Sequence, residues 1–192
     1  MPKPDKSFYL QPDVNEVARK LLGKRLVSHI EGVLCSGLIS ETEAYNGIID
    51  KASHAYGGRL TKRTETMYAE GGVAYVYLCY GIHHLFNVVT NIEGVPHAVL
   101  VRALFPEKGL EWMMERRNHP KPHLLCSGPG TLSQALGIKT QHNGSDLSGD
   151  TIWIEETGIV VPDAEVSVGP RIGVGYAAED ALLPYRYVWK RP

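Results

Sequence analysis

The sequence predicts an α+β fold: a single domain with a curved, mostly antiparallel β-sheet that is flanked by helices and carries a protruding β-hairpin. Helical and strand-like segments are mixed without the regular βαβ alternation that builds a parallel sheet. The 192 residues suffice for one domain with one sizeable core. Apolar residues make up 43% and charged residues 21% of the chain, as in globular rather than disordered proteins.

The N-terminal part predicts a short lead-in followed by one helix. We expect residues 1–7 to be mobile and residues 8–192 to form the domain. Asp13 is suited to cap a helix, with Glu16 three residues later, and Gly23 is placed to end it. Between these signals, apolar residues recur at helical spacing: Val14, Val17, Ala18, Leu21 and Leu22.

Strands are predicted where β-branched and aromatic residues concentrate between turn residues. They cover residues 25–30, 33–45, 74–79, 85–89, 97–103, 151–155 and 185–189. The turn Glu31-Gly32 joins the first two strands. The segment 46–72 is polar, contains glycine and is basic in its middle, so we expect a long functional loop there.

Two further helices are predicted in the second half of the chain. Residues 106–117 have a proline near the start, apolar residues in the middle and a basic end, all of which favour a helix. Residues 118–123 then form a loop. A short helix is expected over residues 131–136, after the turn Gly128-Pro129-Gly130.

The charge balance limits the kinds of partner that the chain can bind. Twenty basic residues oppose twenty-one acidic ones, for a formal net charge of -1. A nonspecific nucleic-acid binder is usually strongly basic, so any DNA site here must be a local patch. The N-terminus lacks the apolar core of a signal peptide, and no apolar run approaches the ~20 residues of a membrane span. We expect a soluble, intracellular protein without membrane contact.

Glu43 is the first candidate for chemistry. Residues Glu41, Glu43 and Tyr45 should share one face of a strand, because side chains repeat every two residues there. One interpretation is an exposed carboxylate on a half-buried strand; the other is a general base that takes a proton from water. Glu41 would raise the pKa of Glu43 by repulsion, and Arg102 would oppose this effect and help to hold the water. Arg102 follows an apolar run, where an arginine is costly to bury unless it is paired.

A group of tyrosines is the second candidate. The segment Tyr75-Val76-Tyr77-Leu78-Cys79-Tyr80 fits ordinary strand composition, since tyrosine favours strands. It also fits a platform on which bases stack. Tyr80 precedes Gly81 at a predicted turn, so it could protrude as a wedge between base steps.

His54 lies in the predicted loop together with three basic residues, Arg59, Lys62 and Arg63. One interpretation is a solvated loop with an incidental histidine. In the functional interpretation, His54 donates a hydrogen bond inside a pocket while the basic residues contact phosphates.

Cofactor and metal motifs are not convincing. Gly173–Ala178 matches the dinucleotide pattern G-x-G-x-x-A, but only 14 residues follow it, which leaves no room for the required βαβ unit. The pair His83-His84 has no metal-ligand spacing around it, and the three cysteines form no C-x-x-C pair. We expect neither a cofactor nor a metal.

Several motifs, in matching order, resemble one known family, the alkyladenine (3-methyladenine, N-methylpurine) DNA glycosylases. The similarity runs from about Phe8 to Val188. Its marks are the segments 9–12, 41–45, 54–59 and 75–81, Asn87, and the segments 100–104, 126–129, 134–138 and 171–175. The resemblance implies a DNA repair hydrolase that flips damaged purines out of double-stranded DNA and hydrolyses the N-glycosidic bond. Alkylated purines are the expected substrates, with deaminated and etheno adducts as further candidates.

Position by position, the resemblance implies roles for individual residues. Glu43 would activate the water, and Arg102 and the backbone carbonyl of Ile172 would position it. The base pocket would be built by Tyr45, Tyr77, His54 and Asn87, with Ile172 as a fifth base-binding residue. The two tyrosines would sandwich the base, and Asn87 would exclude normal guanine.

The same resemblance assigns residues to the DNA. Tyr80 would fill the space that the flipped nucleotide leaves. Arg59 would contact a backbone phosphate, and Lys62 and Arg63 lie in the same basic loop. No lysine occupies a matched catalytic position, which implies a monofunctional glycosylase without strand cleavage. We expect a monomer in the bacterial cytoplasm, associated with the nucleoid.

Two other functions remain open from the sequence. The first is a protein that binds distorted or single-stranded DNA through Tyr80 and the basic loop without chemistry. The second is a hydrolase that uses Glu43 on a free nucleoside.

Overall fold

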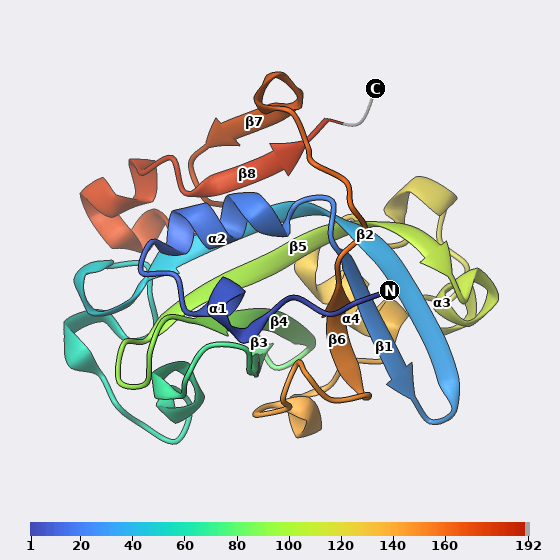
Figure 1. The fold of residues 1–192 in the computed structure, drawn as a ribbon, viewed down its shortest axis with the longest axis horizontal. Helices are drawn as coiled ribbons and strands as arrows, with labels where there is room; N and C mark the ends of the chain where they lie inside the picture. The colour runs from blue at the N-terminus through green and yellow to red at the C-terminus, as the bar shows by residue number, and fades with distance from the viewer. Residues whose placement is uncertain (191–192) are drawn as a thin grey trace.

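The computed structural model describes residues 1–190, so the last two residues of the predicted domain lie outside the described part. Within it, eight strands form one antiparallel sheet that curls into a half-barrel (Figure 1). The strands are β1 (Arg25–Ile30), β2 (Val33–Asn46), β3 (Ala74–Cys79), β4 (His83–Thr90), β5 (His97–Lys108), β6 (Ile152–Glu155), β7 (Val166–Gly169) and β8 (Arg186–Trp189). The predicted single-domain α+β fold with a curved antiparallel sheet is confirmed. Of these strands, only β7 was not predicted.

The sheet follows the order β3-β4-β5-β2-β1-β6, with β8 paired to both β2 and β7. The long strand β2 is central to this arrangement. On one side it pairs with β5; on the other it pairs with β1 over residues 33–38 and with β8 over residues 41–43. The register between β2 and β5 shifts on both sides of Glu41. Such bulges bend a strand and redirect its side chains, and this one lies two residues before Glu43.

Four α-helices accompany the sheet in residues 1–190. They are α1 (Lys6–Tyr9), α2 (Val14–Leu21), α3 (Leu110–Arg116) and α4 (Pro129–Leu136). The predicted cap of α2 is confirmed, because the Asp13 side chain accepts a hydrogen bond from the backbone N–H of Asn15. Figure 1 shows α2 crossing in front of β2 and β5.

The predicted helix over residues 106–117 is wrong in its first turn. Residues 106–108 belong to β5, where Pro106 lies opposite Gly37 and Lys108 opposite Ser36 of β2. Helix α3 begins only after Gly109, which has a φ of +75°. Pairing with a distant strand therefore overrides the local signal of a proline at a helix start.

Short 3₁₀ helices fill several connections. They are η1 (Gly47–Ile49), η2 (Tyr56–Gly58), η3 (Glu65–Tyr68), η4 (Pro122–Leu124), η5 (Thr140–His142), η6 (Asp163–Glu165) and η7 (Gly175–Leu182). The first three lie within the predicted loop 46–72, which therefore has more regular structure than expected. The dinucleotide-like pattern at residues 173–178 runs into η7 rather than into a βαβ unit.

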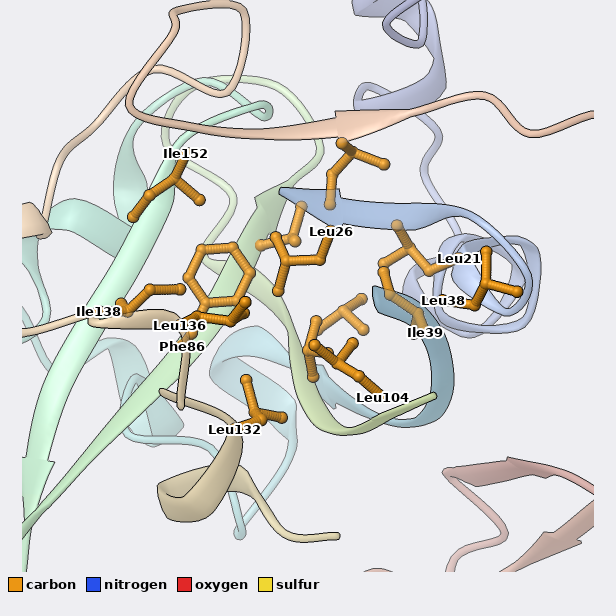
Figure 2. Close-up of a cluster of buried hydrophobic side chains, with 14 of the residues drawn as sticks. Leu21, Leu26, Leu38, Ile39, Phe86, Leu104, Leu132, Leu136, Ile138 and Ile152 are labelled. Atoms are coloured by element: carbon orange, nitrogen blue, oxygen red, sulfur yellow. The ribbon is translucent and has the colours of Figure 1, made fainter. Parts of the chain in front are cut away.

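The two faces of the sheet have different uses. Side chains such as Val76, Phe86 and Val99 belong to the main hydrophobic core. Figure 2 shows Phe86 in this core together with Leu21 of α2 and Leu136 of α4. On the opposite face, Tyr75 and Ala98 join a smaller cluster with Met67 of η3. Neighbouring residues of a strand alternate between the two faces. The residues on the second face are therefore held in position by neighbours that are packed in the core. That second face carries the candidate site.

The N-terminal residues are attached to the domain. Asp5 caps α1, and Lys3 Nζ donates to the backbone carbonyls of Ser148 and Gly149, just before β6. The backbone N–H of Glu156, just after β6, donates to the carbonyl of Pro2. The mobility expected for residues 1–7 stays a prediction. None of the helices in residues 1–190 is long and apolar enough to cross a bilayer.

Candidate active site

A small cavity opens on the second face of the sheet. It has a volume of about 40 Å³ and is lined by residues from β2 to β5, from the loop before β3 and from η7. The lining residues are Tyr45, Ala52, His54, Met67, Tyr75, Tyr77, Asn87, Ala98 and Tyr176. Of the five base-pocket residues inferred from the sequence, four are among them and Ile172 is not. Such a volume holds only a few water molecules.

Glu43 lies beside this cavity and is completely buried, with 0% of the residue exposed. Its Oε1 accepts a hydrogen bond from the backbone N–H of Ile172 at 2.8 Å. Its Oε2 accepts one from the Tyr45 hydroxyl at 2.9 Å. The interpretation of an exposed strand carboxylate is therefore excluded by the structure.

Burial raises the pKa of Glu43 above the ordinary value of a glutamate. The charge of Arg102, the Ile172 N–H and the Tyr45 hydroxyl oppose this shift, while the charge of Glu41 adds to it and is the smallest of these influences. The predicted repulsion by Glu41 thus has the expected direction but is minor. A carboxylate with a raised pKa is a better proton acceptor than an exposed one, provided that it is ionised.

Arg102 of β5 connects the two carboxylates of β2. Its Nε donates to Glu41 Oε1 at 2.8 Å, and its Nη1 lies 3.3 Å from Glu43 Oε2. Arg186 of β8 donates to the same Glu41 oxygen at 2.6 Å. Glu41, Glu43 and Tyr45 therefore share one face of β2, as predicted, and two arginines balance the two carboxylates. The sequence reasoning did not single out Arg186, whose position depends on the pairing of β8 with β2.

Arg171 ties the loop that carries Ile172 to the end of β2. Its guanidinium forms a buried ion pair with Asp50, with 2.8 Å between Nη2 and Oδ1. It also donates to the carbonyl of Ala44 at 2.9 Å and lies over the Tyr45 ring, 4.9 Å from its centroid. This ion pair holds the Ile172 N–H next to Glu43. In the sequence, Arg171 was noted only as part of a motif, and Asp50 was not noted. An ion pair between residues far apart in the sequence produces no periodic pattern that would reveal it.

The side chains of Tyr75, Tyr77 and His54 form one cluster of aromatic rings. The ring centroids of Tyr75 and Tyr77 are 5.4 Å apart, and the His54 ring meets Tyr77 edge-on at 4.7 Å. His54 Nδ1 lies 2.9 Å from the Tyr75 hydroxyl. Burial, with a smaller effect of nearby arginine charges, lowers the pKa of His54 to about 4. The imidazole is therefore neutral at physiological pH.

Asn87 of β4 lines the cavity and is buried. Its amide nitrogen donates to the backbone carbonyls of Tyr75 at 3.0 Å and Leu85 at 3.4 Å. Both amide hydrogens are thus engaged with the backbone, which fixes the orientation of the side chain. The polar atom that remains for the cavity is Oδ1.

The predicted protruding hairpin is formed by β3 and β4. At its tip, Tyr80 and Gly81 have φ values of +50° and +74°, as both central residues of a type I′ turn require. The turn is closed by a hydrogen bond of 3.1 Å from the N–H of Ile82 to the carbonyl of Cys79. Tyr80 is 90% exposed and Ile82 is 70% exposed. Two large apolar side chains therefore project from the tip into solvent.

The three basic residues that were assigned to the DNA are placed differently. Arg59, Lys62 and Arg63 are all exposed. Arg63, however, lies over the ring of Tyr77, 5.1 Å from its centroid, and so reaches the wall of the cavity. Among residues 1–190, no group of three metal-binding side chains is suited to hold an ion.

Comparisons with known proteins show what this chain is similar to. A family model described as methylpurine-DNA glycosylase matches residues 7–192. The chain is 49% identical over 185 residues to a Chlamydia felis protein named "Putative 3-methyladenine DNA glycosylase", covering 95% of this chain and 93% of that one. A Bacillus cereus protein of the same name is 45% identical over 197 residues, covering 96% of this chain and 94% of its own.

Proposed function

The chain belongs to the methylpurine-DNA glycosylase family, and we propose that it releases alkylated purines from double-stranded DNA by hydrolysing the N-glycosidic bond with water that Glu43 activates. The observation that carries this proposal is the complete burial of Glu43 against Arg102, Tyr45 and the Ile172 N–H. Burying a charged group is costly unless the group is paired. A buried and paired carboxylate beside a cavity is therefore a candidate for a functional role.

The contacts of Glu43 indicate where the water binds. An ionised carboxylate oxygen accepts about two hydrogen bonds. Oε2 already faces the Tyr45 hydroxyl and Arg102, whereas Oε1 has the Ile172 N–H as its partner. Oε1 therefore has more capacity left for a water. Glu43 takes a proton from this water, the remaining oxygen bonds to the sugar C1′, and the electron pair of the C1′–N9 bond leaves with the purine.

The carboxylate has a second effect on the same step. The sugar develops positive charge as the purine leaves, as in other glycoside hydrolyses. Glu43 is close enough to this charge to stabilise it, because the base pocket begins at Tyr45, whose hydroxyl donates to Glu43. The charge of Arg102 favours the ionised form of Glu43 and so opposes the effect of burial on its pKa.

The cavity is suited to a flat, electron-poor ring. Tyr45 and Tyr77 line it and would stack on the two faces of the base. Alkylation gives a purine positive charge, which aromatic faces attract and which makes the base a good leaving group. Neutral lesions such as hypoxanthine lack this activation and need protonation as well. Asn87, fixed by two backbone carbonyls, would crowd the 2-amino group of normal guanine.

The hairpin and the basic loop would hold the DNA. A glycosidic bond cannot be reached inside a stacked duplex, so the nucleotide must be flipped out. Tyr80 would enter the space that it leaves, because its ring is exposed on a stiff turn. Arg59 and Lys62 would contact phosphates. With water as the nucleophile, the product is an abasic site in an intact strand. We further propose that the protein acts as a monomer on DNA in the cytoplasm.

The test uses duplexes that carry one 1,N6-ethenoadenine or one hypoxanthine, together with methylated DNA. Each is incubated with the protein, and abasic sites are then cleaved with alkali. We expect base release, with strand breaks that appear only after the alkali step. The absence of release from every substrate would refute the glycosylase proposal.

The same assay separates the two alternative functions. A protein that only recognises distorted or single-stranded DNA would bind the lesion duplexes and release nothing. A nucleosidase would release bases from free nucleosides and leave the duplexes intact. The buried, hydrogen-bonded Glu43 favours an enzyme over a binding protein.

A further inference from the structure

Arg63 occupies an unexpected place in the free protein. It lies in the exposed loop after η2, yet its guanidinium is 5.1 Å from the centroid of the Tyr77 ring. Its Nη2 is also 3.5 Å from His54 Nε2, and its charge acts on the Tyr75 hydroxyl. Three residues that line the cavity thus meet one side chain from outside it.

The contact with His54 defines the state of the imidazole. A guanidinium can only donate hydrogen bonds, so Nε2 must accept from Arg63. Nδ1 then carries the hydrogen and donates to the Tyr75 hydroxyl at 2.9 Å. Arg63 thereby satisfies the acceptor nitrogen of His54, a residue that lines the cavity. A base that uses this acceptor must first take the place of Arg63.

The size of the cavity also requires a movement. Its volume of about 40 Å³ is enough for a few water molecules, and a purine needs more space. The main core behind β3 and β4 is tightly packed and cannot yield easily. Arg63 is exposed, belongs to a loop and contacts two lining residues, Tyr77 and His54, so it can turn away without disturbing the core.

We propose that Arg63 is a specificity-determining residue that holds the place of the base over Tyr77 until DNA replaces it. This inference rests on the proposed function. The guanidinium is a planar cation over an aromatic ring, as the alkylated purine would be. The guanidinium and the base cannot occupy the same place, so Arg63 leaves Tyr77 when the base enters. A phosphate of the bound strand then receives its donors in a bidentate contact.

The consequence is a preference for bases that arrive on a strand. A flipped nucleotide brings phosphates that can bind the displaced Arg63 side chain, whereas a free base brings none. The side chain therefore weakens the binding of free purines, including the product. When the binding-competent form is only a fraction of the total, the apparent affinity falls by that fraction. For lesion DNA, the new contact between Arg63 and a phosphate compensates for the lost contact with Tyr77. The affinity for lesion DNA therefore stays largely intact.

The experiment compares Arg63→Gln with Arg59→Gln. The two arginines lie in the same loop, but within residues 1–190 the Arg59 side chain makes no hydrogen bond or ring contact with the cavity, so it is a matched control. Calorimetry measures the binding of free 3-methyladenine to each protein. A gel-shift titration measures binding to a duplex with one 1,N6-ethenoadenine.

We expect Arg63→Gln to bind free 3-methyladenine about tenfold more tightly than the wild type, if the open form is roughly a tenth of the total. Arg59→Gln should bind it like the wild type, and both variants should bind the duplex more weakly. Unchanged or weaker binding of the free base by Arg63→Gln would overturn the inference. That result is distinguishable from failure of the proposed function, which appears as a wild-type protein that releases no base.

Discussion

Tyr45 links the two halves of the candidate site, because its ring lines the cavity and its hydroxyl donates to Glu43. Burial raises the pKa of Tyr45 well above that of a free phenol, and the charge of Glu43 adds to this shift. The hydroxyl therefore keeps its hydrogen and remains a donor throughout the neutral range. Its removal should act on Glu43 without disturbing the stacking of the base.

Tyr45→Phe tests this link through the pH dependence of the single-turnover rate. Glu43 must be ionised to accept a proton, so the rate falls as the pH drops through its pKa. Burial raises that pKa, and the Tyr45 hydroxyl lowers it by donating to the charged form. Loss of the hydroxyl raises the pKa further, and the acid limb should move to higher pH. A limb that stays in place or moves to lower pH would contradict the role of Tyr45.

At the scale of single residues, sequence patterns predicted the carboxylates, tyrosines and histidine that now lie together. Strand alternation was enough to put Glu41, Glu43 and Tyr45 on one face. It was not enough to find Asp50 or Arg171, since a buried ion pair that joins residues far apart in sequence leaves no periodic signal. The place of Arg63 over Tyr77 was equally hidden, because it depends on how the loop folds back.

The hairpin of β3 and β4 is the element that would enter the DNA. Its type I′ turn places Tyr80 at the tip, where the residue is 90% exposed. With this exposure the ring is available to contact DNA.

Tyr80→Ala should weaken the capture of a lesion in a duplex more than in a single strand, because only the duplex has a vacant space to fill. Base–aromatic stacking is worth ~1–3 kcal/mol, so a loss of roughly tenfold or more in duplex affinity is expected. Titration of both forms of one lesion oligonucleotide measures the effect. Equal losses on the two forms would argue against a wedge.

The ion pair between Asp50 and Arg171 joins two loops beside the candidate site. Asp50 and Arg171 have side chains that are 1% and 0% exposed, and they join the residues after β2 to the segment that carries Ile172. Removal of one partner leaves the other charge buried and unpaired.

Asp50→Asn should lower the free energy of unfolding by about 3–5 kcal/mol, measured by urea denaturation. The rate of base release should also fall, because the Ile172 N–H is no longer held against Glu43. Glu179→Gln is the matched control, since it removes an exposed partner of the neighbouring Lys51 and should change stability little. A stability close to the wild type in Asp50→Asn would show that this ion pair does not hold the loop.

At the scale of the whole molecule, the fold class was predictable and the topology was not. The mixture of helix and strand signals predicted α+β, and the strand positions were nearly right. The pairing of β8 with β2 and the extension of β5 through Pro106 depend on contacts between distant segments. Local sequence patterns contain no information about such partners. Residues 106–108 were therefore predicted to start a helix, although they extend strand β5.

The near-zero net charge gives a prediction about DNA binding. With a formal charge of -1, the attraction to phosphates must come from a local patch such as Arg59, Lys62 and Arg63. Each phosphate contact contributes about −0.9 to the slope of log affinity against log salt, so roughly three contacts predict a slope near −3. Binding of a duplex with one 1,N6-ethenoadenine at several salt concentrations measures it, because the flipped base also releases Arg63 to a phosphate. Lys62→Gln should reduce the slope by about one, and an unchanged slope would place the DNA elsewhere.

The most direct test of the whole account is single-turnover release of 1,N6-ethenoadenine from a duplex by the wild type and by Glu43→Gln. The glutamine keeps the size of the side chain and can still bond to the Ile172 N–H, but it cannot accept a proton from water. General-base catalysis is worth ~10²–10⁴ in rate, so we predict a loss of at least about a hundredfold, with binding of the lesion duplex retained. Release at the wild-type rate by Glu43→Gln would contradict the assignment of the buried carboxylate as the catalytic base.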